Sequence, residues 1–137
     1  LKAENGAALE KAGALVGFHT DDSITDSRWF LRSAGMAVRA GMSRDKALYA
    51  LTMANALILA LGVRVGSLEK GKAADFIVLS GDPLSVYTHV LETWVEGKKV
   101  FDRSIPGDYL VQVGGNGASN DRSVHDDDED DSDGGGN

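Results

Sequence analysis

The amino-terminal part of the chain alternates between apolar stretches and short polar segments, and this pattern predicts one strand set among helices. The run 14–20, Ala-Leu-Val-Gly-Phe-His-Thr, is apolar without a clean alternation, which is typical of a strand buried on both faces. A short helix-compatible stretch at 7–12 precedes it, and Gly13 ends that stretch. We therefore expect a helix followed directly by a buried strand.

Three further helices are predicted after this strand. Apolar residues recur at helical spacing over 30–38, and Gly41 ends this helix. Ser43 is a candidate N-cap for the second helix, and Thr52 is a candidate N-cap for a third helix that closes at Gly62. A strand and helices in this order indicate one unit of an α/β fold.

Beyond Gly62 the pattern changes to short strands separated by turns. Residues 75–80 form a candidate strand that ends at a Gly-Asp-Pro turn. Residues 90–96 and 99–101 are expected to pair as a hairpin across the Gly-Lys turn at 97–98. We place a domain boundary near Gly62, where the helical pattern gives way to the strand pattern.

The pattern divides the chain into an α/β segment at 1–62, a strand-rich segment at 63–113 and an acidic tail at 114–137. The formal net charge of −7 lies in the tail, because residues 121–137 hold eight acids and one arginine. Residues 1–120 hold 13 acids and 13 bases and are neutral as a whole. The tail combines glycine and aspartate with almost no apolar residue, so we expect it to be disordered.

Charge and composition exclude several classes of function. A neutral body lacks the basic excess of nucleic-acid-binding proteins, so we expect no nucleic-acid partner. No apolar run approaches the about 18 residues of a membrane span, so we expect no membrane partner. The absence of cysteine excludes disulfides, thiolate metal ligands and cysteine nucleophiles. The cellular compartment and a homo-oligomeric state are left open.

The strongest chemical pattern is the pair Asp21-Asp22, directly after the predicted strand. Two carboxylates placed so close together repel each other, and a bound metal ion relieves that repulsion while leaving one carboxylate free for proton transfer. The carboxyl ends of strands are also where α/β barrels keep their active sites. An ordinary role stays open as well, in which Asp22 or Ser23 caps the next helix and Asp21 is solvated.

Two other patterns have ordinary interpretations. Residues 66–73 carry the glycines and lysine of a phosphate-binding loop, but Ala73 lacks the hydroxyl that binds magnesium and a strand follows instead of a helix. We expect a turn between strands there and no nucleotide. Residues 126–133 are dense in carboxylates but lack the ligand spacing of an EF-hand, so we expect a solvating tail.

Three stretches together resemble the amidohydrolase superfamily. Residues 17–22, Gly-Phe-His-Thr-Asp-Asp, are similar to the end of the eighth barrel strand of that superfamily, and residues 50–56 resemble its helix with the pattern Thr-x-Asn-x-Ala. Residues 62–79 resemble the return of the chain from the barrel into a small β-sandwich, and the hairpin at 95–100 continues the match. The resemblance covers 7–101 and is nearest to imidazolonepropionase-like members.

This resemblance implies the last strand and helices of a TIM (β/α)₈ barrel, followed by part of a small β-sandwich, or composite, domain. It implies a metal-dependent hydrolase that acts on carbon–nitrogen bonds of small-molecule substrates, in non-peptide or peptide-like amides, with one or two divalent metals that are usually zinc. Asp21 matches the aspartate that contacts the metal and takes a proton from the metal-activated water. Asp22 would orient the water or the substrate.

The resemblance also implies that most of the active site is missing from this chain. The His-x-His motif, the bridging lysine or glutamate and the two later histidines of the superfamily have no counterpart here. The chain is therefore expected to be an inactive carboxy-terminal fragment of a longer enzyme. The alternative is a non-catalytic structural or interaction module derived from an amidohydrolase.

Overall fold

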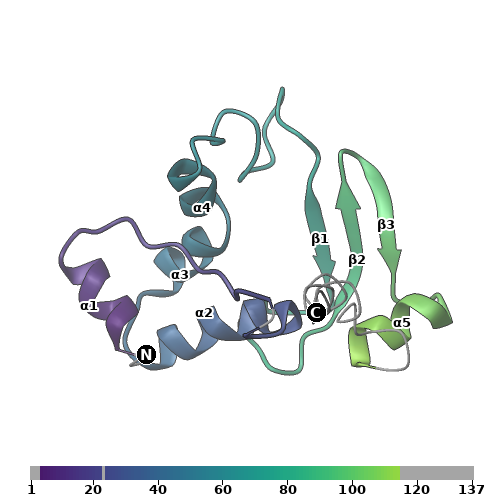
Figure 1. Cartoon of the computed structure of the whole chain (residues 1–137), viewed down its shortest axis with the longest axis horizontal. Coiled ribbons are helices and arrows are strands. Elements are labelled where there is room, and N and C mark those ends of the chain that lie inside the picture. Colours follow the sequence, from purple (N-terminus) through teal and green to yellow (C-terminus); the bar gives the residue numbers. More distant parts are fainter. Residues whose placement is uncertain (1–3, 23, 115–137) are drawn as a thin grey trace, which may run out of the picture.

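The computed structural model describes residues 4–22 and 24–114. Figure 1 shows the helices α1 to α4 grouped on one side and a three-stranded sheet on the other, with α5 beside the end of β3. The helical elements are α1 (Asn5–Lys11), the 3-10 turn η1 (Ser27–Trp29), α2 (Phe30–Arg39), α3 (Arg44–Leu51), α4 (Met53–Ile58) and α5 (Pro106–Val113). The strands are β1 (Phe76–Leu79), β2 (Val90–Val95) and β3 (Lys98–Asp102).

Small side chains build the core of the helical group. Buried alanines lie on the facing sides of α2 and α3, and they let the two helices approach closely because each contributes only one methyl group. Val16, Phe18 and Leu84 pack against this cluster from the segments outside the helices. The fully or almost fully buried members are Ala34, Ala37, Met42, Ala47 and Ala50.

The amino terminus of α3 is capped from another helix. Ser43 occupies the N-cap position, as predicted, but its side chain makes no capping bond to α3. Instead the Glu10 carboxylate of α1 accepts hydrogen bonds from the Ser43 backbone N–H, at 2.8 Å, and from the Ser43 hydroxyl. These two bonds, with Lys46 nearby, lower the pKa of Glu10. Glu10 therefore joins α1 to α3 through a charged acceptor at a helix start, where a negative charge is favourable.

The third predicted helix ends earlier than its sequence suggested. We expected closure at Gly62, but α4 ends at Ile58 and the chain turns at Ala60, whose φ is +57°. The Leu61 N–H donates to the Ala56 carbonyl at 2.7 Å, and the Ala60 N–H donates to the Leu57 carbonyl at 3.0 Å. This is a Schellman closure with alanine in the place that glycine normally takes.

The strand predicted over 14–20 does not form in the described part of the chain. These residues have no regular secondary structure and make no sheet pairing, and Leu15 is 52% exposed. A strand needs partners for its backbone groups, and no described strand lies beside this segment to supply them. The expectation of a strand buried on both faces was wrong for this structure.

The predicted strand and hairpin form, but the two turn residues of the hairpin are Glu96 and Gly97 instead of the predicted Gly97 and Lys98. The three strands form an antiparallel sheet in the order β1-β2-β3. Glu96 and Gly97 connect β2 to β3 with φ values of +50° and +75°, which is the two-residue turn that suits the twist of a hairpin. Phe76 and Trp94 are paired across β1 and β2, and their rings stack at 5.6 Å between centroids. The described residues contain no second sheet that would complete a β-sandwich.

The helix α5 was not predicted, although its ends carry recognisable signals. Pro106 is in the first turn, where its missing N–H costs nothing, and Asp108 adds a negative charge there. Gly114 closes the helix with a φ of +80°, so it belongs to α5 and not to the acidic tail. The predicted disorder of residues 115–137 lies outside the described residues.

Candidate functional site

The segment that leads to the paired aspartates is held by the junction of α3 and α4. The Phe18 backbone N–H donates to the Ala50 carbonyl at 3.2 Å, and the Asn55 side-chain amide donates to the Phe18 carbonyl at 2.8 Å. Thr52 lies at the junction as both the C-cap of α3 and the N-cap of α4, with an irregular backbone (φ −129°, ψ −95°). Both backbone groups of Phe18 are therefore satisfied by residues of the 50–56 stretch.

Asp21 is in a turn directly after this anchored segment. Its φ of +56° is left-handed, which is uncommon for a residue other than glycine. The Asp21 carbonyl accepts the N–H groups of Ile24 at 2.6 Å and Thr25 at 3.2 Å, so the turn is closed tightly. The Asp21 side chain is exposed. A residue kept in a rare conformation, with its carboxylate in solvent, is a candidate for function.

Asp22 has a different role in the same turn. Its carboxylate accepts the Ser27 N–H at 2.8 Å at the start of η1. This is close to the ordinary capping role that the sequence left open for Asp22. Next to it, Asp26 caps η1 by accepting the Arg28 N–H, and the Arg28 guanidinium lowers the pKa of Asp26 to about 2. Asp22 and Asp26 thus accept hydrogen bonds that shape the turn, and Asp21 is an exposed residue of the same turn.

The described residues do not by themselves fit a metal centre. Within 4–22 and 24–114, no three or more His, Cys, Asp or Glu side chains lie together in an arrangement that could hold an ion. A protein metal site with fewer than about three protein ligands is unusual. Asp21 can supply one carboxylate ligand, and any others would have to come from elsewhere.

The loop that resembles a phosphate-binding motif is occupied by its own side chains. Lys72 donates from Nζ to the Ser67 hydroxyl at 2.6 Å, and Ser67 donates to Glu69 at 2.6 Å. The Lys72 side chain is only 12% exposed and also pairs with Glu69 at 3.5 Å. A strand, β1, follows the loop, so no helix amino terminus lies beneath it. The arrangement supports the structural interpretation of this turn.

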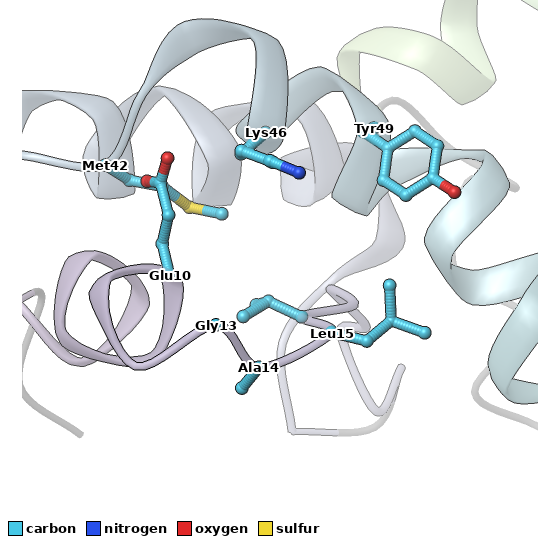
Figure 2. Close-up of a pocket in the computed structure, with 8 residues that line it drawn as sticks. Glu10, Gly13, Ala14, Leu15, Met42, Lys46 and Tyr49 are labelled. Atoms are coloured by element: carbon cyan, nitrogen blue, oxygen red, sulfur yellow. The ribbon is translucent and has the colours of Figure 1, made fainter.

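A small cavity in the described part of the chain is lined by residues other than those of the aspartate turn. Figure 2 shows it between α3 and the coil that follows α1, with Lys46 and Tyr49 on one side and Leu15 on the other. Its volume is about 90 Å³, well below that of a typical ligand site. Glu10, its acidic group, is already bound to Ser43. This cavity therefore does not compete with Asp21 as a functional site.

A second hollow, of about 330 Å³, lies at the surface of β2 and β3. Its two carboxylates, Glu92 and Asp102, both accept from Lys99, at 2.7 and 3.0 Å. Hydrogen bonds from Ser104, and then from Lys99, lower the pKa of Asp102 to about 2. The charges in this hollow neutralise one another, so they stabilise the hairpin instead of presenting a reactive group.

Asn55 is the residue whose role sequence reasoning missed. It was recognised only as part of a motif, and its contact with Phe18 was not foreseen. The available signal is that Asn55 is the single strongly polar residue in the apolar stretch 53–61. A lone amide at half-buried depth needs a hydrogen-bond partner, and here the Phe18 carbonyl is that partner.

These observations define a class of structure. It is an α/β unit that has an aspartate turn on its helical side and a small antiparallel sheet. The profile of the Amidohydrolase family matches residues 4–101. This chain therefore belongs to the amidohydrolase family, as the resemblance indicated.

Individual relatives agree with the family. Adenine deaminase 2 of Shouchella clausii is 39% identical over 93 residues, which cover 65% of this chain and 16% of that protein. Imidazolonepropionase of Syntrophobacter fumaroxidans is 50% identical over 48 residues, which cover 34% of this chain and 11% of that protein. The crystal structure of an amidohydrolase from Thermotoga maritima superimposes with a TM-score of 0.72 at 35% identity, covering 75% of this chain and 27% of that one.

Each match covers a much larger share of this chain than of the relative. The chain spans only 10–16% of the curated relatives that it matches. The site described above is therefore one part of what those relatives contain.

Proposed function

We propose that this chain is the carboxy-terminal part of a metal-dependent hydrolase that acts on carbon–nitrogen bonds of small molecules. Residues 14–20, which have no strand partner among the described residues, would be the last strand of its (β/α)₈ barrel once neighbouring strands from outside this chain pair with them. The sheet would be part of its small β-sandwich. Membership of the amidohydrolase family supports the reaction class, since its relatives include an adenine deaminase and an imidazolonepropionase. The identity of the bond depends on barrel loops that lie outside this chain.

Asp21 is the proposed proton-transferring residue. The observation that carries this proposal is its exposed carboxylate in a left-handed turn, three residues after the doubly anchored Phe18. A carboxylate held at the end of a fixed segment can accept a proton from an attacking water and return it to the leaving nitrogen. Asp22, whose carboxylate accepts the Ser27 N–H, is proposed to orient the water or the substrate.

Asp21 is also the one ligand that this chain is proposed to contribute to a divalent metal, with zinc as the expected ion. The remaining ligands are proposed to come from residues outside this chain. The isolated 137-residue chain is accordingly expected to be inactive.

The proposal is tested with the protein encoded by the complete reading frame that contains this sequence. We expect it to hydrolyse a member of a panel of amides, lactams and aminopurines, and a chelator should abolish that activity. Asp21→Asn should lower kcat by at least about 10²-fold, because asparagine cannot accept the proton. Asp45→Asn, in the first turn of α3, is the control for removal of an exposed aspartate.

Two outcomes would contradict the proposal. One is a protein without chelator-sensitive hydrolysis on the whole panel. The other is an Asp21→Asn variant that is as active as Asp45→Asn.

A second candidate function, a non-catalytic interaction module, is favoured by one observation. Large apolar side chains are exposed after α4, with Leu59 at 66% and Val63 at 88% exposure, and such surfaces often mark protein contacts. The reading frame distinguishes the two functions. A His-x-His motif encoded a few hundred residues upstream supports the enzyme, and a start codon close to Leu1 supports the module.

A further inference from the structure

We propose that Asn55 is a positioning residue that sets the place of Asp21, and that Gly17 is required to let it do so. This inference rests on the proposed function of Asp21. It concerns a residue outside the aspartate turn, on α4, that makes no contact with a reacting group.

The first observation is that both backbone groups and the side chain of Phe18 are held by contacts. Its N–H is bound by the Ala50 carbonyl of α3 and its carbonyl by the Asn55 amide of α4. Its side chain packs against the buried alanine cluster. Backbone and side chain of Phe18 are thus fixed together, although the segment 14–20 has no sheet partner among the described strands.

The second observation is the closeness of Asn55 to Gly17. A Cβ atom added at Gly17 would lie 2.1 Å from Asn55 Oδ1 and 3.0 Å from Ile58 Cδ1. No side chain is compatible with the first of these distances, so the amide occupies the space that any other residue at position 17 would need. The positions 17 and 55 are therefore matched to each other.

The third observation is the short chain between the anchor and the turn. Asp21 follows Phe18 by three residues, a reach of at most about 11 Å. Its turn is closed by bonds from Ile24 and Thr25 to its own carbonyl. Because little slack lies between two fixed points, a shift at Phe18 moves the Asp21 carboxylate. A displacement of about 1 Å at a reacting group can cost about 10²-fold in rate.

The test compares two side-chain amides that each donate one bond to a backbone carbonyl, in the protein encoded by the complete reading frame. Asn55→Ala removes the bond to Phe18, and Gln112→Ala removes the equivalent 2.9 Å bond from α5 to Val90. We expect Asn55→Ala to lower kcat by about 10-fold or more with KM changed by less than about 2-fold. Gln112→Ala should leave kcat unchanged at a similar loss of melting temperature.

Hydrogen exchange supplies a readout that does not depend on activity. Asn55→Ala should speed exchange of the Phe18 amide more than that of amides in β1, and Gln112→Ala should not. A double-mutant cycle tests the contact between positions 17 and 55. Gly17→Ala alone should lower kcat strongly, and it should lower kcat much less in the Asn55→Ala background, where the clashing amide has been removed.

Three results would overturn the positioning role: equal kcat in Asn55→Ala and Gln112→Ala, an effect of Gly17→Ala that is additive with Asn55→Ala, or unchanged exchange at Phe18. An inactive unmodified protein would instead overturn the proposed function. The exchange rates and the stability of the same double-mutant cycle would then decide whether Asn55 holds the 17–21 segment.

Discussion

Asp21 and Asp22 are neighbours in the sequence, but their side chains have different surroundings. The carboxylate of Asp22 accepts the Ser27 N–H, whereas the exposed Asp21 is in a left-handed turn. A residue whose side chain completes a turn acts through structure, and a residue whose backbone is strained while its side chain faces outward is suited to chemistry. The two substitutions should therefore differ in effect.

Asp22→Asn should reduce kcat of the complete protein by less than about 10-fold, against at least about 10²-fold for Asp21→Asn. Asparagine at position 22 keeps an oxygen that can accept the Ser27 N–H, so the turn is retained. Steady-state kinetics of both variants measure the contrast. If Asp22→Asn is the more damaging change, the catalytic carboxylate is Asp22.

Glu10 couples stability to pH through its bonds to Ser43. Its pKa is lowered in the folded protein, so this contribution is present above the ordinary glutamate range and is lost as pH falls through the folded pKa. Glu10→Gln should therefore lower the melting temperature at pH 7 and have little effect near pH 3. Glu4→Gln removes the same charge at the start of α1, where the side chain makes no capping bond, and is the control.

Thermal unfolding of both variants across this pH range checks the prediction. Parallel pH curves for the Glu10→Gln and Glu4→Gln variants would show that Ser43 is not bound by the carboxylate.

At the scale of elements, the loop between α4 and β1 contains two glycines with nearly the same positive φ. Gly66 has φ +95° and Gly71 has φ +94°. A Cβ at Gly66 would lie 2.6 Å from the Cβ of Ala56 and 3.1 Å from the Cα of Met53, whereas a Cβ at Gly71 meets nothing within 4 Å. Of these two glycines, only Gly66 is therefore packed closely on α4.

Gly66→Ala should be more destabilising than Gly71→Ala. Both substitutions carry the cost of alanine in a left-handed conformation, about 1–2 kcal/mol. Gly66→Ala adds an overpacking cost of about 1–3 kcal/mol. Denaturant unfolding of the two variants measures the difference, and equal stabilities would mean that the loop does not pack on α4.

At the scale of the whole molecule, the described part of the chain has a core of small side chains and a surface rich in large ones. Its buried hydrophobic residues are alanines and one methionine, while Val63, Val86 and Tyr87 are more than three-quarters exposed. A core of this kind buries little apolar area, so we expect modest stability for the chain alone. No helix in the described residues is long and apolar enough to cross a bilayer.

Deleting residues 115–137 should leave the circular dichroism spectrum and the melting temperature of the chain nearly unchanged. The segment holds almost no apolar residue that could contribute to a core. The deletion begins after Gly114, because that glycine closes α5. A fall of more than a few degrees in melting temperature would contradict the expectation.

Local patterns in the sequence were enough to predict most of the elements. Helical spacing with glycine stops predicted α1 and α2, the Ser43 N-cap predicted α3, and the glycine-containing turn predicted the β2–β3 hairpin, because these features depend on neighbours along the chain. The early end of α4 was missed because Ala60 occupies the left-handed position at which glycine usually signals the end of a helix. The helix α5 was missed although its proline and glycine were readable.

By itself the sequence determined the amidohydrolase resemblance and the candidate aspartate pair, because both lie in short contiguous motifs. Only the tertiary structure decided which carboxylate is bound within its own turn and why Asn55 and Gly17 occur together. The physical reason is that Phe18 and Asn55 are 37 residues apart in sequence and meet only through the kink at Thr52. It also decided that 14–20 is not a strand here, because a strand exists only beside another strand.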